Sequence, residues 1–248
     1  MNQYRSAICS LSWGSRKPLP SIIDTISRLG IQGIEIWLPQ LATLALTPLT
    51  ATLKEKNISV VCISAPWGSC FWEHSPVLLH YAKTLGAQGI KVFGDTFNPT
   101  DNLPARLREF CSQAKEADLE VYLETHGGQP RHNTADNTLA LLHATNAPNL
   151  KVILDLYNTH ETGETMESAA EKLAPFLCHF HIKWGYRNER NDYIPLPVSQ
   201  APTAFRNVLS RFAEKPFWYS IEHYESDEDI LDALAVMKSI LPITSAVI

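Results

Sequence analysis

The sequence predicts an α/β protein built as a single (βα)8 barrel, and three observations predict it. Short runs of β-branched and other apolar residues recur along the chain, and segments with helical periodicity separate them. We count eight such strand and helix pairs, which favours a closed barrel over an open sheet. The length of 248 residues fits one domain over residues 1–248. No G-x-G-x-x-G motif follows the first strand, which disfavours a dinucleotide-binding fold.

The expected elements follow one another in strict alternation. The strands are expected at residues 6–11, 33–37, 59–64, 89–93, 120–124, 151–155, 178–183 and 218–222. Helical periodicity, with glycine or proline near several ends, indicates helices between them, for example at residues 18–29, 76–85, 104–117, 133–143, 166–173, 204–212 and 227–240.

Composition and net charge argue against several classes of function. The net charge is −5 and the basic residues are scattered, which argues against a nucleic-acid partner. No stretch approaches the ~18 uninterrupted apolar residues of a membrane span. The first residues lack the pattern of a secretion signal, and the five cysteines form no C-x-x-C pair. We therefore expect a soluble, cytoplasmic protein that acts on a small molecule, with a homodimer left open.

Polar residues stand at the ends of four consecutive expected strands. Because the C-terminal ends of barrel strands converge on one face, these side chains should meet. Carboxylates with one imidazole suit Mn²⁺, Mg²⁺ or Co²⁺, with Zn²⁺ left open. The alternative, helix caps or ion pairs, would need basic partners that the pattern does not reveal. The expected ligands of one divalent metal are Glu124, Asp155, His181 and Glu222.

These motifs, with Gly33-Ile34-Glu35-Ile36-Trp37 and Ser220-Ile221-Glu222, resemble the xylose isomerase-like superfamily of TIM barrels over nearly the whole chain. The superfamily includes D-tagatose 3-epimerase, inosose-processing enzymes, hydroxypyruvate isomerase, endonuclease IV and a 3-dehydroshikimate dehydratase group. The resemblance implies one Mn²⁺, Mg²⁺ or Co²⁺ ion at the four matching positions. In the epimerases the two matching glutamates, here Glu124 and Glu222, also act as acid and base.

The epimerase type gives the first interpretation of function. Arg187, six residues after His181, matches a substrate-contacting arginine of the tagatose epimerase type, whereas Asn158 replaces a histidine of that type. We expect a metal-dependent isomerase or epimerase of a small polyhydroxylated ketone, such as a ketose or an inosose. A carboxylate would remove the proton beside the carbonyl, leaving an enediolate whose charge a metal stabilises.

The dehydratase type is the alternative. Leu123-Glu124-Thr125-His126 and His179-Phe180-His181-Ile182-Lys183 look similar to that group, in which the residues matching His126 and Lys183 serve substrate binding and proton transfer. Strand four carries Lys91, and no arginine, where that group binds the substrate carboxylate. A non-catalytic sugar-binding barrel is a further alternative, and a DNA-repair endonuclease is disfavoured because no basic groove is visible.

Further candidates come from positions near strand ends. Strand alternation could place His126 beside Glu124 and Lys183 beside His181. The alternative for Lys183 is an ion pair with a ligand carboxylate. Glu35 is expected to follow a strand and bind a substrate hydroxyl. Tryptophans after strands could wall a pocket, and four histidines, His74, His80, His132 and His143, are expected at the surface. The expected catalytic set is Glu124, Glu222, His126 and Lys183, and the expected substrate-binding set is Glu35, Lys91, Asn158, Arg187, Trp13 and Trp67.

Overall fold

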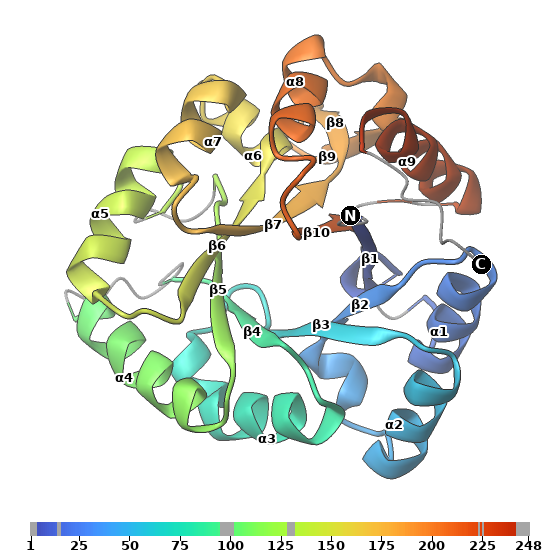
Figure 1. Cartoon of the computed structure of the whole chain (residues 1–248), viewed down its shortest axis with the longest axis vertical. Coiled ribbons are helices and arrows are strands. Elements are labelled where there is room, and N and C mark those ends of the chain that lie inside the picture. Colours follow the sequence, from blue (N-terminus) through green and yellow to red (C-terminus); the bar gives the residue numbers. More distant parts are fainter. Residues whose placement is uncertain are drawn as a thin grey trace.

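Eight parallel strands close into a barrel in the computed structural model, which describes residues 4–13, 16–94, 102–127, 132–222, 224 and 226–241. Each strand pairs with the next along the chain and the last pairs with the first, as the centre of Figure 1 shows. The predicted barrel is confirmed. Its strands are β1 (Arg5–Cys9), β2 (Gly33–Trp37), β3 (Ser59–Ser64), β4 (Gly89–Val92), β5 (Glu120–Glu124), β6 (Leu150–Asp155), β7 (Leu177–Ile182) and β10 (Trp218–Ile221).

Helices form a ring around the barrel and bury their apolar faces against it (Figure 1). In the first of them Ile22, Ile23 and Ile26 are fully buried, at the spacing of one helical face. The helices are α1 (Leu19–Arg28), α2 (Leu46–Glu55), α3 (Ser75–Leu85), α4 (Leu103–Glu116), α5 (Ala135–Thr145), α6 (Leu156–Glu161), α7 (Met166–Leu173), α8 (Thr203–Arg211) and α9 (Asp227–Ile240); short 3-10 helices are η1 (Ser10–Trp13), η2 (Leu38–Leu41), η3 (Phe71–His74) and η4 (Val198–Gln200).

Strand alternation separates an apolar outer core from a mixed interior. In β5, Val121 and Leu123 join the main core between the strands and the helices, whereas Tyr122 packs inside the barrel with Cys62. The interior is tight: a Cβ at Gly89 would lie 2.6 Å from the Tyr122 ring. Apolar residues and aromatic rings fill part of the barrel interior. The inward-facing polar residues are therefore concentrated towards the C-terminal ends of the strands.

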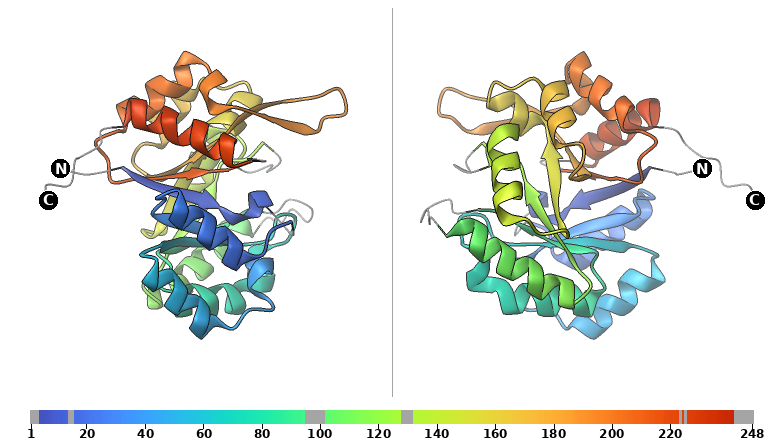
Figure 2. Two further views of the ribbon diagram at one scale, coloured as in Figure 1. Left: turned by 90° about the vertical axis from the view of Figure 1, so that its right-hand side faces the viewer. Right: turned by 60° about the vertical axis from the view of Figure 1, so that its left-hand side comes forward.

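Two helices and one hairpin were not predicted. Helices α2 and α6 lie in segments that were left without a helix, and the start of α6 is capped by Asp155 Oδ1, which accepts from the Asn158 backbone N–H at 2.8 Å. The hairpin of β8 (Trp184–Arg187) and β9 (Tyr193–Leu196) is antiparallel and projects beyond the barrel (Figure 2). Both α6 and the hairpin stand at the end of the barrel that carries the polar residues.

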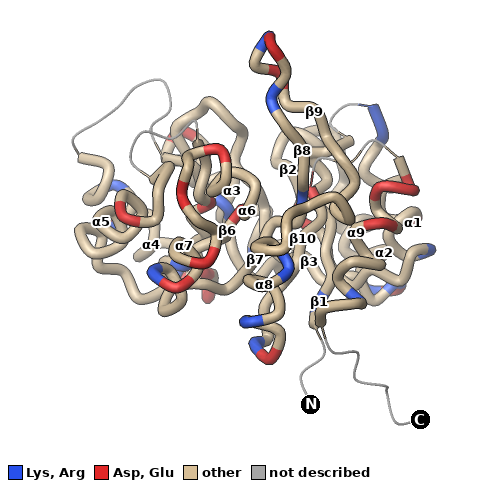
Figure 3. The backbone as a smooth tube through the Cα atoms, turned by 90° about the horizontal axis from the view of Figure 1, so that it is seen from above, with Lys and Arg blue, Asp and Glu red and all other residues tan. Residues whose placement is uncertain are grey.

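Charged residues of both signs are interspersed over the outside of the barrel, and the tip of the β8–β9 hairpin is charged (Figure 3). This distribution agrees with the scattered basic residues of the sequence. No helix in the described ranges combines the length and the apolar character needed to cross a membrane.

Candidate metal centre and substrate cavity

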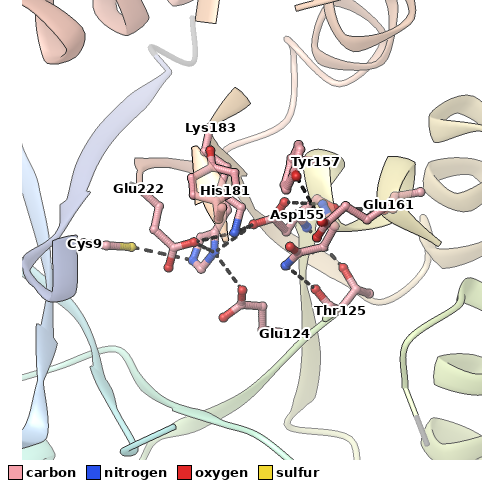
Figure 4. A network of polar contacts seen from close by, with 12 residues as sticks. Cys9, Glu124, Thr125, Asp155, Tyr157, Glu161, His181, Lys183 and Glu222 are labelled. Carbon is pink, nitrogen blue, oxygen red and sulfur yellow. Dashed lines mark hydrogen bonds and ion pairs between the residues drawn. The ribbon is translucent and has the colours of Figure 1, made fainter. Parts of the chain in front are cut away.

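The four expected metal ligands meet at the C-terminal end of the barrel (Figure 4). One ligand atom from each lies within 4.8 Å of the others, and all four side chains are buried. His181 Nδ1 lies 3.3 Å from Glu124 Oε1, 3.5 Å from Glu222 Oε2 and 3.8 Å from Asp155 Oδ2. The residues come from the ends of β5 and β6, from β7, and from the position directly after β10.

The donor atoms of this cluster fit a divalent cation. His181 Nδ1 is buried and has no hydrogen-bond partner among the described residues. The other ring nitrogen, Nε2, lies 3.2 and 3.4 Å from the two oxygens of Glu35, so we assign the ring proton to Nε2. The Nδ1 lone pair then points at three carboxylates, which is a donor set that Mn²⁺, Mg²⁺, Co²⁺ or Zn²⁺ accepts.

The carboxylates do have basic partners, so the expectation that none exist is wrong. Lys91 Nζ lies 2.9 Å from Glu124 Oε2 and 3.6 Å from Glu222 Oε1. Lys183 Nζ lies 2.7 Å from Asp155 Oδ2 and 2.9 Å from Glu222 Oε2. Both lysines are at most 3% exposed. The barrel interior brings them onto the carboxylates from separate strands, which the linear pattern does not reveal.

Negative charge still exceeds positive charge in this cluster. The carboxylates of Glu35, Glu124, Asp155 and Glu222 face the ammonium groups of two lysines, which leaves two negative charges when the histidines are neutral. Burial by itself lowers the pKa of His181, but the surrounding carboxylates, with Glu222 first, outweigh it and raise that pKa well above its usual value. Without a metal, a proton on His181 reduces this buried excess of negative charge to one, and a divalent cation in place of that proton would balance the full two.

Glu35 lies inside β2 and not after a strand, which corrects the expectation. Strand alternation sends Ile34 and Ile36 outward into the main core, so Glu35 points into the barrel and is 1% exposed. Its carboxylate also accepts from His179 Nε2 at 3.0 Å and from Cys62 Sγ at 3.5 Å. Burial acts to raise the pKa of Glu35, but His181, Lys91 and His179 outweigh it and hold that pKa well below its usual value.

A cavity of about 940 Å³ opens above the cluster. Its described walls come from the ends of several strands, from α6 and from the β8–β9 hairpin. Seven expected site residues line it: Glu124, His126, Asn158, Lys183, Arg187, Glu222 and Trp67.

Three expected substrate contacts do not line this cavity. Glu35 and Lys91 lie within the barrel interior, where both are about 1% exposed. Trp13 packs edge-on against Tyr224, at 4.6 Å between ring centroids, and under the ammonium of Lys17. Glu35 and Lys91 therefore contact the ligand cluster from inside the barrel, whereas Trp13 packs beside Tyr224.

One cavity wall is aromatic. The rings of Trp67 and His126 lie 4.2 Å apart, and Phe93 stands edge-on to Trp67 at 4.9 Å. Burial lowers the pKa of His126, although Glu124 opposes the effect. This wall presents an apolar face and one imidazole to the cavity.

The facing wall contains residues that the sequence analysis missed. Tyr157 and Glu161 of α6 and Tyr193 of β9 line the cavity beside Arg187. The side-chain amide of Asn158 donates to the Thr125 carbonyl at 3.1 Å, which ties the start of α6 to the end of β5. Recognising Asp155 as a helix N-cap was the signal that would have placed α6 here.

His132 is buried, so the expectation of a surface position is wrong for this histidine. It is 0% exposed, and burial lowers its pKa to about 3. A Cβ on Gly94 would lie 2.7 Å from its ring, so the absence of a side chain at Gly94 makes room for the imidazole.

Comparisons with known proteins agree with the barrel fold. Residues 23–240 match the model of the xylose isomerase-like TIM barrel family. A 3-dehydroshikimate dehydratase from Bacillus anthracis is 25% identical over 244 residues, which cover 88% of this chain and 84% of the relative.

Solved structures share the fold over nearly the whole chain. The crystal structure of the probable 3-DHS dehydratase AsbF of Bacillus anthracis has a TM-score of 0.78 at 18% identity, covering 94% of this chain and 97% of its own. The IOLI protein with a zinc atom has a TM-score of 0.75 at 16% identity, covering 96% and 98%. D-psicose 3-epimerase from Clostridium cellulolyticum H10, with D-tagatose, has a TM-score of 0.75 at 14% identity, covering 96% and 99%. By its match to the family model, this chain belongs to the xylose isomerase-like TIM barrel family.

Proposed function

We propose that this protein is a metal-dependent isomerase or epimerase of a small polyhydroxylated ketone, such as a ketose or an inosose. One observation carries the proposal: Glu124 and Glu222 both line the cavity and both belong to the four-residue ligand cluster. They come from β5 and from the end of β10, with β6 and β7 between them. Two carboxylates that reach one cavity from separate strands can remove and return a proton at one carbon.

The residues of the cluster have different roles in this reaction. Glu124, Asp155, His181 and Glu222 would hold the metal, which when bound supplies a Lewis acid that polarises a carbonyl oxygen. One glutamate removes the proton beside the carbonyl and the other returns it to the same or the adjacent carbon. The ammonium of Lys183, beside Glu222 at the cavity wall, adds positive charge where the oxygen becomes negative. The aromatic wall of Trp67 packs against the apolar face of the substrate.

Proton exchange tests this proposal directly. The Mn²⁺-loaded protein is incubated in D₂O with a panel of ketoses and inososes, and NMR follows deuterium at the carbons beside the carbonyl. The proposal expects exchange with at least one member, accompanied by an isomer or epimer. A protein with full metal occupancy that exchanges no proton on any member overturns it and leaves a sugar-binding barrel as the better interpretation.

A lyase of the 3-dehydroshikimate dehydratase type is the second candidate. The relative that is 25% identical over 88% of this chain favours it. His126 and Lys183, which line the same cavity, would serve as the acid that releases a β-hydroxyl after the same proton removal. Including 3-dehydroshikimate in the panel and recording ultraviolet absorbance separates the two candidates, because dehydration produces an aromatic chromophore and epimerisation does not.

A further inference from the structure

The cations on the described cavity walls are both held by carboxylates. Lys183 lies between Asp155 and Glu222. Arg187, at the far wall, is held by Glu161: its Nε and Nη2 donate to the two Glu161 oxygens at 2.5 and 3.3 Å. Its remaining nitrogen, Nη1, donates to the Asn191 carbonyl at 3.2 Å.

Glu161 is itself fixed in place. Tyr157 Oη donates to Glu161 Oε1 at 2.9 Å, one turn earlier on α6. The hydrogen bonds from Arg187 and Tyr157 hold the pKa of Glu161 below its usual value, although burial acts in the opposite direction. The carboxylate is therefore charged at neutral pH and opposes the charge of the guanidinium.

The Glu161–Arg187 pair stands away from the metal ligands. Lys183 Nζ contacts the ligands Asp155 and Glu222 and lies 5.9 Å from the ring centroids of Tyr157 and Tyr193. The guanidinium of Arg187 lies on the Tyr193 ring at the same 5.9 Å. In Figure 4, Glu161 and Tyr157 lie on the far side of Asp155 from Cys9. A substrate that reaches the ligands with its carbonyl would extend its other end towards this pair.

We propose that Glu161 masks Arg187, so that the cavity selects a substrate that is uncharged at the end remote from the metal ligands. The inference rests on the proposed function, and it names the substrate class as a free polyol or ketone with neither carboxylate nor phosphate at that end. Hydroxyl groups can share donors with a paired guanidinium, whereas an anion must displace Glu161 to obtain a bidentate contact. Glu161 is thus a specificity-determining residue.

The test compares two ligands that differ by one charge. Shikimate and its methyl ester share the ring and its hydroxyl groups, and neither carries a ketone that the enzyme could enolise. Their dissociation constants are measured by calorimetry with Mn²⁺-loaded wild type, Glu161→Gln and the double variant Glu161→Gln with Arg187→Met. Glutamine keeps the shape and removes the opposing charge.

The proposal expects wild type to bind the methyl ester at least as tightly as shikimate. Glu161→Gln should shift the ratio of the two affinities towards shikimate by about tenfold or more, because a guanidinium gains a charged acceptor. The double variant should lose this shift, and Tyr157→Phe, which leaves the Glu161–Arg187 contact intact, should not produce it. Circular dichroism and metal content check that every variant is folded and loaded.

Two outcomes overturn the inference. In the first, the wild-type protein binds shikimate more tightly than its methyl ester. In the second, the Glu161→Gln variant gains no affinity for shikimate, which includes the case in which this variant binds neither ligand. Failure of the proposed function looks different. It appears as the absence of deuterium exchange with any ketone, and it leaves the ratio of these binding constants unaffected.

Discussion

The centre of the barrel and the wall of its cavity both place acids against bases, but they do so in different surroundings. In the centre, Lys91 and Glu124 are 1% and 2% exposed and each has several charged neighbours. At the wall, Arg187 and Glu161 are 38% and 18% exposed and pair mainly with one another. Water screens the wall pair, whereas the central charges depend on their neighbours for compensation.

Single substitutions should therefore cost more stability in the centre of the barrel than at the cavity wall. Removing one charge from the centre leaves another buried charge uncompensated, which destabilises the fold. Removing one charge from the cavity wall exposes its partner to water at little cost in stability. Residues of this wall can therefore change substrate specificity without a large loss of stability.

Glu222→Gln should lower the rate of proton exchange by about 10²- to 10⁴-fold, because it removes one of two carboxylates that can carry the proton. The measurement is deuterium incorporation at saturating substrate, with metal content determined in the same sample. Circular dichroism should show an unchanged fold. Undiminished exchange at full metal occupancy removes Glu222 from the catalytic set.

Lys91→Met should destabilise the protein by about 3–5 kcal/mol, because the ammonium that faces Glu35 and Glu124 is lost from a buried site. Denaturant unfolding of the metal-free protein measures the change. The matched control is Lys172→Met, since Lys172 pairs with the exposed Asp136 at 2.7 Å and should cause no measurable loss. Equal losses for the two variants would contradict the contrast between centre and surface.

Metal binding should stabilise the wild-type protein and should do so only weakly in Asp155→Asn. A ligand at 100 times its dissociation constant adds about 2.7 kcal/mol to the free energy of unfolding. Thermal unfolding with Mn²⁺ or Zn²⁺, against a chelator, measures the gain. Glu161→Gln, outside the ligand cluster, serves as the control and should keep the full gain. If Asp155→Asn is stabilised by the metal as much as the wild-type protein is, the metal binds at a site that does not include Asp155.

The Glu161–Arg187 pair should contribute no more than about 1 kcal/mol, and its contribution should depend on pH. The folded pKa of Glu161 is below the ordinary value, so the stabilisation is present above the unfolded pKa and is lost as pH falls through the folded pKa. The free energies of unfolding of wild type and Glu161→Gln should therefore differ slightly at pH 7 and converge once the pH falls below the folded pKa of Glu161. A difference that grows on acidification contradicts this sign.

Regular periodicity and strand ends were enough to predict the barrel and its polar end. Glu124 and Asp155 end strands whose other residues are apolar, and parallel strands deliver their C-terminal ends to one face. The expectation for Glu35 failed because it placed the residue after a strand, although the strand expected at residues 33–37 contains Glu35 and alternation within β2 turns it inward. The sequence-based prediction also failed for α6, whose Asn158-Thr159-His160 segment resembles a turn although Asp155 caps it as a helix.

The fold class and the approximate ends of the strands could be predicted from the sequence, because both follow from local alternation and helical spacing of apolar residues. The charge pairs depend on how the chain folds in three dimensions. Lys91 reaches Glu222 through closure of the barrel, and Arg187 reaches Glu161 because the strands of the β8–β9 hairpin lie beside α6. Such pairs join residues that are distant along the chain, and no local pattern encodes them. The position of the candidate metal cluster could be predicted from the strand ends. The charged partners that set its net charge could not, because they come from distant parts of the chain.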